Sequence, residues 1–384
     1  MNHDFTNKTI LVAGGMGFIG SNFIRYVLER YDGVAIINFD KLTYSGNRAN
    51  LRDIEERFDT GTYLFVQGDV GNEVDVTQVF EAYRPEFVIN FAAETHVDRS
   101  IHVGAKEFID TNNTGVFNIL EAVKKYGCEK YVQVSTDEVY GQLPNPHDCD
   151  KDADLDEVRD LKFHEDSPFR PNVPYSATKA GGDCLCNAYY HTWKVPVIVT
   201  HCSNNYGPYQ YPEKLVPYWT SRLMSGLKIP VYGDGNNIRD WIHVEDHIRA
   251  LILCLVKGIP GETYNIGADN ERTNLQMAEI LVRITDEIKF LRSNAMNGAS
   301  SDPREWIEFV QDRPGHDRRY AIDATKIKTE LGWQPEVTAD KFYDKLKEVI
   351  QWYADNQAWV ENVIAKTGVA NAHIDLWASH NLQS

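Results

Sequence analysis

The sequence predicts an α/β protein with a doubly wound parallel sheet, followed by a second, smaller α/β domain. Short β-branched runs alternate with longer helical patterns through the first half of the chain. This alternation is typical of parallel strands joined by right-handed helical crossovers. A glycine-rich turn follows the first run, and the regular spacing is lost after about residue 200. These three observations together define the fold class.

Six strands and the helices between them follow from this pattern. The strands are predicted at Thr9–Ala13, Val34–Phe39, Tyr63–Gln67, Phe87–Phe91, Tyr131–Val134 and Val197–Thr200. Beyond them, a helix is predicted near Val244–Lys257. Residues 145–168 are rich in Asp, His and Pro without a clean period, so they are predicted as a long surface loop.

The domain organisation follows from the same change in spacing. Residues 1–200 are assigned to the first domain, 201–355 to a loop-rich substrate-binding domain and 356–384 to a C-terminal extension. Part of residues 240–260 is a candidate to return to the first domain. A linker is expected at 293–303.

Composition limits the class of partner. The chain of 384 residues has 39 Lys and Arg against 56 Asp and Glu, a formal charge of −17, which argues against nucleic acid or an anionic membrane. No run approaches the roughly 18 apolar residues of a membrane span, and residues 1–8 lack the pattern of a signal peptide. Six scattered cysteines without a CxxC pair indicate no metal site. We therefore expect a soluble cytoplasmic protein.

The glycine-rich turn indicates a dinucleotide site. Gly14, Gly17 and Gly20 precede an apolar helical pattern. Their spacing allows a tight turn, a close approach to a pyrophosphate and close packing of helix on strand, which is the Rossmann-like arrangement. Asp40 ends the second predicted strand, 20 residues beyond Gly20, where a carboxylate binds ribose hydroxyls and repels a 2′-phosphate. The sequence therefore favours NAD over NADP, while Asp69 either passes near the adenine or is a turn residue.

Two acids and a hydroxyl lie together at the end of the fifth predicted strand. Thr136, Asp137 and Glu138 follow the apolar run 130–134 directly, at the sheet edge where ligands bind in open α/β folds. Burial and a neighbouring charge can separate the pKa values of two adjacent acids, so that one donates a proton and the other accepts one. The alternative is that both acids simply face water at the start of a loop.

Tyr175 and Lys179 lie four residues apart, on one face of a predicted helix. An ammonium close to the phenol, with the positive nicotinamide of NAD nearby, would favour phenolate and lower the pKa of the tyrosine from about 10 toward neutrality. On an ordinary helix such a pair is a surface contact. Beside a dinucleotide fold it indicates a catalytic base.

These motifs together resemble the extended short-chain dehydrogenase/reductase family and, within it, the nucleotide-sugar 4,6-dehydratases. The resemblance spans roughly residues 8–355. It is carried by GGMGFIG at 14–20, FDKLTYSGN at 39–47, NFAAETHVDRS at 90–100, STDEVYG at 135–141, PYSATKA at 174–180, CSNNYGPYQYPEKLVP at 202–217, IRDWIHVEDH at 238–247 and DRPGHDRRYAID at 312–323. Ala13 departs from the threonine that is frequent in the family.

The resemblance implies a redox-neutral dehydration of a nucleotide-diphosphate hexose. Tyr175 would take the C4 hydroxyl proton beside Lys179, Glu138 the C5 proton, and Asp137 would protonate the departing C6 hydroxyl while Thr136 holds the C4 oxygen. It also implies a tightly bound NAD that is regenerated in each turnover. The implied cofactor-binding residues are Gly14, Gly17, Phe18, Ile19, Gly20, Asp40, Lys41, Thr43, Asp69, Val70, Ala92, Ala93, Tyr175 and Lys179.

The resemblance also implies the substrate-binding set and a homodimer. The substrate residues are His96, Thr136, Asn204, Asn205, Glu213, Lys214, Leu215, Arg239, Asn274, Arg313 and His316. dTDP-glucose is favoured as the substrate, with UDP-glucose as the alternative. A 4-epimerase, a uronate decarboxylase and a noncatalytic NAD sensor are the competing functions. The first two do not need the Asp-Glu pair, and the third would not need both Tyr175 and Lys179.

Overall fold

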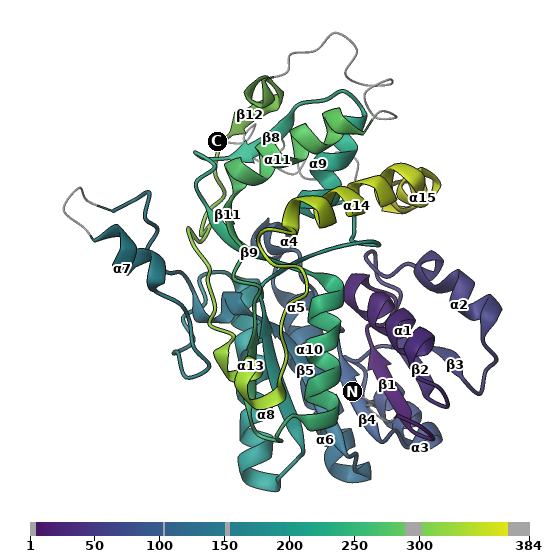
Figure 1. Cartoon of the computed structure of the whole chain (residues 1–384). Helices are drawn as coiled ribbons and strands as arrows, with labels where there is room; N and C mark the ends of the chain where they lie inside the picture. Colours follow the sequence, from purple (N-terminus) through teal and green to yellow (C-terminus); the bar gives the residue numbers. More distant parts are fainter. Residues whose placement is uncertain (1–4, 103, 150–153, 289–301, 368–384) are drawn as a thin grey trace.

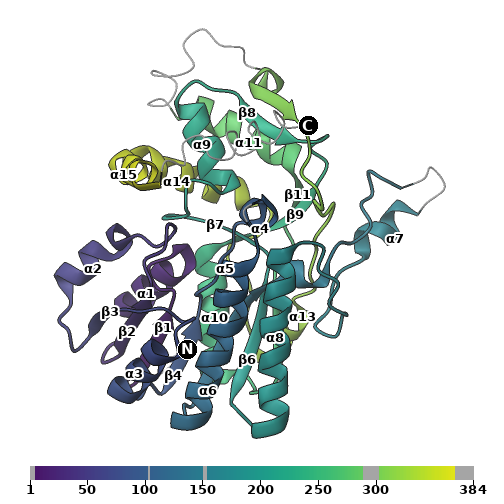
Figure 2. The ribbon, with the colours of Figure 1, turned by 180° about the vertical axis from the view of Figure 1, so that it is seen from behind.

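The computed structural model describes residues 5–102, 104–149, 154–288 and 302–367, and Figures 1 and 2 show it from opposite sides. Most of the predicted linker at 293–303, and residues 368–384 of the predicted C-terminal extension, lie outside the described residues. Within these ranges every helix is too short or too polar to cross a lipid bilayer.

A seven-stranded parallel sheet forms the larger part of the molecule, which confirms the predicted fold class. Its order is β10-β6-β5-β4-β1-β2-β3, and every neighbouring pair is parallel. The strands are β1 (Thr9–Ala13), β2 (Ala35–Asp40), β3 (Tyr63–Gln67), β4 (Phe87–Asn90), β5 (Lys130–Thr136), β6 (Val197–Cys202) and β10 (Thr263–Ile266). The six predicted strands are confirmed to within two residues at each end. The edge strand β10 was not predicted.

Helices cover both faces of this sheet, as the alternation of side chains along β1 requires. Ile10 and Val12 face one apolar cluster, whereas Leu11 and Ala13 face another. The first cluster is covered by α1 (Phe18–Arg30), α10 (Val244–Lys257) and α13 (Thr325–Leu331), and the second by α3 (Glu73–Tyr83), α6 (Val116–Tyr126) and α8 (Pro174–Trp193). Each fully buried aliphatic side chain in these layers contributes about 1.5–3 kcal/mol. The predicted helix at Val244–Lys257 is confirmed.

Shorter elements connect the strands. They are η1 (Arg48–Leu51), α2 (Arg52–Arg57), α4 (Val97–His102), α5 (Lys106–Ile109), the π-helical η2 (Asp110–Gly115), η3 (Asp137–Tyr140) and α7 (Leu155–Asp160). The region predicted as a surface loop carries α7 and projects from the molecule in Figure 1. Arg318 links the start of this region to the rest of the protein, because it forms ion pairs with Asp148 at 2.7 Å and with Asp234 at 2.9 Å.

A second unit lies above the sheet in Figure 1. It contains a three-stranded sheet, β11-β9-β7, and a two-stranded sheet, β12-β8, packed with helices around their own apolar cluster. Its elements are β7 (Asn204–Tyr206), α9 (Leu215–Met224), β8 (Ile229–Tyr232), β9 (Ile238–His243), β11 (Glu271–Thr273), α11 (Asn274–Glu287), η4 (Pro303–Trp306), β12 (Ile307–Val310), α14 (Phe342–Asp355) and α15 (Gln357–Thr367). Between them in the chain, α10 and β10 return to the large sheet.

Candidate active site

Two adjoining hollows lie where the strands of the large sheet end. They share Gly14, Gly17, Ser45, Phe91 and Ala93 as common walls. All residues that the sequence implied for a cofactor line one or both of them: Gly14, Gly17, Phe18, Ile19, Gly20, Asp40, Lys41, Thr43, Asp69, Val70, Ala92, Ala93, Tyr175 and Lys179. Residues from separate parts of the sequence are thus brought together along one groove.

Gly14, Gly17 and Gly20 have different structural roles. Gly14 has a φ of +77°, and a Cβ there would lie 2.4 Å from the Ala92 nitrogen. A Cβ on Gly20 would lie 2.4 Å from the Gly14 carbonyl oxygen, so both positions require the absence of a side chain. A Cβ on Gly17 would make only one ordinary contact, at 3.4 Å, and Gly17 lines both hollows. A ligand can therefore approach the backbone closely at Gly17.

The start of α1 is suited to an anion. Gly17 is its N-cap, no side chain caps the helix, and no acidic residue lies in its first turn. The first N–H groups of a helix lack intrahelical acceptors and carry the positive end of its dipole. Because this turn lines the hollow, the site fits a pyrophosphate.

Asp40 is fixed beside this turn. Its buried carboxylate accepts hydrogen bonds from the Met16 nitrogen at 2.9 Å and the Leu42 nitrogen at 2.7 Å. Burial raises the pKa of Asp40, and these two N–H groups oppose that shift. Nearby, Lys41 Nζ pairs with Asp69 Oδ2 at 2.6 Å. The Asp40 carboxylate can accept hydrogen bonds from ribose hydroxyls, so the site fits a dinucleotide whose adenosine ribose carries free hydroxyls.

The end of β5 places two acids in unequal surroundings. Asp137 is 2% exposed, and its Oδ2 has no hydrogen-bond partner among the described residues. Burial, followed by the charge of Glu138, raises the pKa of Asp137 well above its ordinary value. Burial also raises the pKa of Glu138, but the guanidinium groups of Arg313 and Arg239 oppose that shift. Asp137 is therefore the better proton donor and Glu138 the better acceptor.

Thr136 links this pair to the backbone. Its hydroxyl oxygen accepts from the Glu138 nitrogen at 3.3 Å and so caps η3, while its hydroxyl donates to Asp137 Oδ1 at 3.3 Å. Thr136, Asp137 and Glu138 all line the same hollow as Tyr175 and Lys179.

Lys179 alone does not lower the pKa of Tyr175. Burial, and next the charge of Glu138, raise the pKa of Tyr175 well above 10. The Lys179 ammonium instead donates to the Val134 carbonyl at 2.7 Å. Burial also lowers the pKa of Lys179, although the carboxylate of Asp183 opposes this. The spacing on α8 placed both groups correctly, but burial outweighs the attraction that the sequence suggested.

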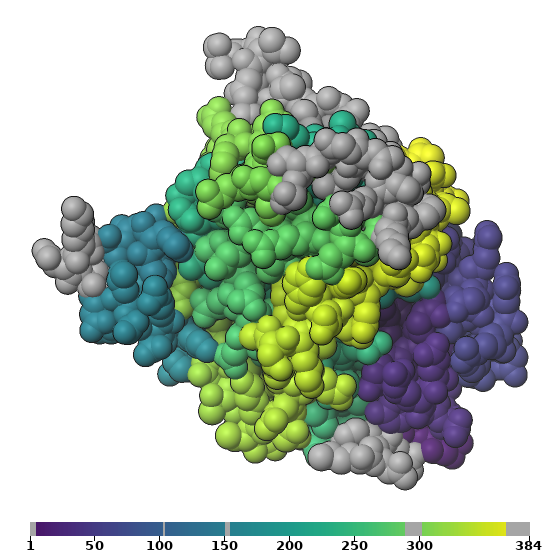
Figure 3. Space-filling model, turned by 45° about the horizontal axis from the view of Figure 1, so that its top comes forward, coloured from purple at the N-terminus to yellow at the C-terminus, as the bar shows by residue number. Residues whose placement is uncertain are grey.

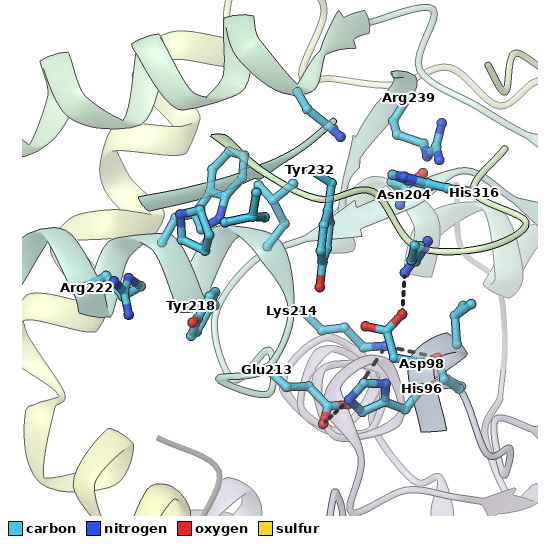
Figure 4. A pocket seen from close by; sticks show the side chains of 18 of the residues that line it. His96, Asp98, Asn204, Glu213, Lys214, Tyr218, Arg222, Tyr232, Arg239 and His316 are labelled. Atoms are coloured by element: carbon cyan, nitrogen blue, oxygen red, sulfur yellow. Dashed lines mark hydrogen bonds and ion pairs between the residues drawn. The ribbon is translucent and has the colours of Figure 1, made fainter. Parts of the chain in front are cut away.

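We call the hollow lined by Tyr175 and Lys179 the catalytic hollow. A larger cavity of about 450 Å³ continues from it into the second unit (Figure 4). The two share Thr95, Glu138, Asn204, Glu213 and Lys214. The larger cavity is lined by these residues of the implied substrate set: His96, Asn204, Glu213, Lys214, Leu215, Arg239, Asn274, Arg313 and His316. The remaining two, Thr136 and Asn205, line the catalytic hollow.

Four cations line this cavity, Lys214, Arg222, Arg239 and Arg313, and carbonyl groups hold Lys214 and Arg239. Arg239 donates to the carbonyls of Ile238 at 2.7 Å and Asp317 at 2.8 Å. Lys214 Nζ donates to the Thr95 carbonyl at 3.0 Å, and Arg313 pairs with Asp98 at 3.2 Å. Lys214 Nζ also lies 3.9 Å from Glu213 Oε1. Carbonyl partners orient a cation without cancelling its charge. The cavity therefore brings guanidinium and ammonium groups together in a protein that is acidic overall, although Asp98, Glu138, Glu213 and Glu308 also line it.

His316 and Glu213 complete the polar wall. Burial lowers the pKa of His316 to about 4, so this imidazole is neutral at pH 7. Its Nδ1 lies 2.6 Å from Asp312 Oδ1. Glu213 Oε2 lies 3.4 Å from His96 Nε2, and Tyr44 donates to the other Glu213 oxygen at 3.3 Å.

Sequence reasoning missed the aromatic part of this cavity. Tyr218, Trp219, Arg222 and Tyr232 line it, and Figure 4 shows Tyr232 among the polar groups. One signal was available: Tyr218 and Arg222 lie four residues apart, on one face of α9, and Lys214 is the N-cap of this helix. Tyr232 ends the short strand β8 and carried no comparable signal.

Within the described residues, no cluster of three or more His, Cys, Asp or Glu side chains could hold a metal ion. The fold and the site, with the glycine turn, the Tyr-Lys pair and the paired acids, define an extended short-chain dehydrogenase/reductase.

The comparison with known sequences assigns the family. The chain belongs to the GDP-mannose 4,6 dehydratase family, which it matches over residues 11–346. It is 43% identical to the dTDP-glucose 4,6-dehydratase of Xanthomonas campestris over 366 residues, which is 93% of this chain and 96% of that protein. It is also 43% identical to the enzyme of the same name from Salmonella typhimurium over 375 residues, with 95% and 98% coverage.

Solved structures agree. The dTDP-glucose 4,6-dehydratase of Bacillus anthracis in complex with NAD has a TM-score of 0.78 and 44% identity, covering 93% of this chain and 99% of that one. The enzyme of the same name from Streptomyces venezuelae, with NAD and a further ligand bound, has a TM-score of 0.79 and 38% identity, covering 92% and 99%. The UDP-glucose 4-epimerase of Thermotoga maritima, with a TM-score of 0.74, is 27% identical, covering 91% and 99%.

Proposed function

We propose that this protein is an NAD-dependent dTDP-glucose 4,6-dehydratase, a hydro-lyase that forms dTDP-4-keto-6-deoxyglucose. The observation that carries the proposal is the pair Asp137 and Glu138. Both acids line the catalytic hollow with Tyr175, Glu138 also lines the larger cavity, and the two acids have unequal electrostatic surroundings. A 4-epimerase needs the tyrosine and lysine but has no elimination step for two acids to catalyse.

The groove along the ends of the strands is the proposed NAD site. Gly17 and the start of α1 would hold the pyrophosphate, and Asp40 the adenosine ribose. Tyr175 and Lys179 would lie at the reactive end of the cofactor. Bound there, NAD accepts a hydride from C4 of the hexose and returns it to C6.

The side chains at the end of β5 and on α8 would move the protons. Tyr175 would take the proton of the C4 hydroxyl as a phenolate, a form that the positive nicotinamide of bound NAD would favour together with the buried charge of Lys179. The resulting ketone makes the C5 proton acidic; Glu138 removes it before water leaves and returns a proton to C5 when the hydride reaches C6. Asp137 gives its proton to the C6 oxygen, the C6–O bond breaks and water leaves. Each proton transfer typically contributes about 10²- to 10⁴-fold in rate.

The cavity between the two units would hold the nucleotide. Arg239, Arg313 and Lys214 provide the charge that a diphosphate requires, and a guanidinium matches phosphate oxygens with its planar fork. Tyr232 and Trp219 offer aromatic surface for a pyrimidine base. Glu213 and His96 lie where this cavity approaches the catalytic acids.

The test uses two substrates in parallel. The purified protein is incubated with dTDP-glucose or UDP-glucose, and the absorbance that alkali induces in a 4-keto-6-deoxy sugar is followed. We expect product from dTDP-glucose at a higher kcat/KM than from UDP-glucose. A higher value with UDP-glucose would reassign the nucleotide, and conversion to a galactose derivative without a ketone would indicate the epimerase. Absence of any conversion would contradict the proposal.

We further propose a homodimer that pairs through α6 and α8, as the family resemblance implies. These helices carry Phe117 at 42% and Trp193 at 51% exposure. Tyr189 lies between them, with ring centroids 6.4 Å from Phe117 and 4.7 Å from Trp193. An exposed aromatic stripe of this kind favours burial against a second copy.

A further inference from the structure

The C-terminal helix α15 makes a polar contact with the part of the sheet unit that surrounds the glycine turn. The Trp359 indole N–H donates to Asn50 Oδ1 at 2.9 Å, across 309 residues of sequence. In Figure 3 the surface of α14 and α15 lies against that of the N-terminal part of the chain. Asn50 belongs to η1 and is only 2% exposed, so its side chain is fixed by its surroundings.

Asn50 also contacts the glycine turn directly. Its Nδ2 donates to the Met16 carbonyl at 3.0 Å, and the Asn47 nitrogen donates to the same oxygen at 3.0 Å. The Met16 nitrogen in turn donates to Asp40 Oδ2. Met16, which lies between Gly14 and Gly17, is therefore held at its nitrogen and at its carbonyl.

The aromatic surroundings of Trp359 add a second connection. Its ring packs against Tyr209, Trp352 and Tyr353, with centroids 5.8, 5.5 and 6.4 Å away. The Tyr353 hydroxyl contacts the carbonyls of Gly207 and Gln210, each at 3.0 Å. Gln210 lines the catalytic hollow. The same cluster thus holds the loop on the opposite side of the groove.

A turn with three glycines has more conformational freedom than other turns, and a binding site that is fixed in advance loses less entropy on binding. We propose that Trp359 is a positioning residue for the cofactor. Through Asn50 it fixes the Met16 carbonyl and the glycine turn, and so slows release of the dinucleotide. This inference rests on the proposed function, because it takes NAD as the ligand of the groove.

The test compares two substitutions of the same kind in full-length protein. Trp359→Phe keeps an aromatic ring but removes the N–H that Asn50 accepts. Trp352→Phe makes the same change in the same cluster, where the N–H of Trp359 remains. Release of NADH is followed by its fluorescence after dilution, and the NAD content of the purified proteins is measured. We expect roughly three- to tenfold faster release for Trp359→Phe, the effect of one hydrogen bond, and release like the wild type for Trp352→Phe.

A second variant guards against a general loss of stability. Asn50→Ala interrupts the same series of hydrogen bonds, from Trp359 to Met16, at its next residue. If Trp359 acts through Asn50, the double variant Trp359→Phe/Asn50→Ala releases NADH no faster than Asn50→Ala alone. Additive effects, equal release from Trp359→Phe and Trp352→Phe, or unchanged release would overturn the inference. Wild-type protein that binds no nicotinamide cofactor would instead contradict the proposed function.

Discussion

At the scale of single residues, chemistry depends on how burial divides two neighbouring acids. Asp137 and Glu138 are adjacent in sequence, yet only Glu138 has two guanidinium groups as the main opposition to burial. The sequence located the pair correctly at a strand end. It could not give the opposing charges, because Arg239 and Arg313 come from β9 and from a segment after β12.

The proposed base can be tested by substitution. Glu138→Gln keeps the size of the side chain but removes its basicity. We expect loss of C5 proton exchange by at least about 10²-fold, with NAD still bound, measured by deuterium incorporation from heavy water. Full dehydratase turnover by this variant would disprove the role of Glu138. In the wild type, Glu138 must be ionised, so kcat/KM should fall on the acid side at a pH above 4.5, its ordinary pKa.

The buried acid has a stability consequence of opposite sign. The folded protein raises the pKa of Asp137, so ionisation opposes folding, and stability is lost as pH rises from about 3.8 through the raised value. Asp137→Asn removes that penalty. We expect this variant to raise the Tm at pH 8 and to change it little at pH 3.5, while turnover falls. Asp156→Asn, whose side chain is 90% exposed in the wild type, is the control. A Tm gain that does not depend on pH would contradict this assignment.

At the scale of elements, the strand-turn-helix unit from β1 to α1 contains one glycine that the fold requires and another that cofactor binding requires. Gly14→Ala would place a Cβ against the backbone of Ala92 in a left-handed conformation, whereas Gly17→Ala meets only an ordinary contact. We expect Gly14→Ala to lower the free energy of unfolding by about 1–3 kcal/mol. Gly17→Ala should leave stability nearly unchanged but weaken NAD binding. Urea denaturation and cofactor titration distinguish the two, and equal losses in both variants would refute this division.

The elements also show which parts of the fold could be predicted from the sequence. β-branched runs and glycine spacing predicted six strands, because parallel buried strands carry a strong local pattern. β10 has only four residues, Thr263–Ile266, and its pairing with β6 depends on the intervening 60 residues, which enter the second unit and return to the large sheet through α10. The aromatic wall of the large cavity was missed for the same reason. Tyr232 pairs with its neighbours in a small sheet rather than repeating along one helix.

At the scale of the whole molecule, the proposed dimer would leave the groove open. α6 and α8 cover the face of the sheet opposite α1 and α10 (Figure 2). We expect light scattering to give twice the mass of the chain, and Phe117→Glu to shift it toward the monomer by placing a charge in an apolar contact. Phe309→Glu alters a more exposed aromatic residue, at 58% against 42% for Phe117, on β12, and should have no effect. A monomeric wild type would remove this proposal.

The route of the chain between the two units has a practical consequence. It leaves the sheet after β6, returns for α10 and β10, leaves again at β11 and comes back for α13. A single cut by a protease therefore cannot free the upper unit as an intact piece. An engineer who wants another sugar nucleotide accepted cannot splice in a relative's module at one joint. Specificity in this architecture has to be altered one side chain at a time.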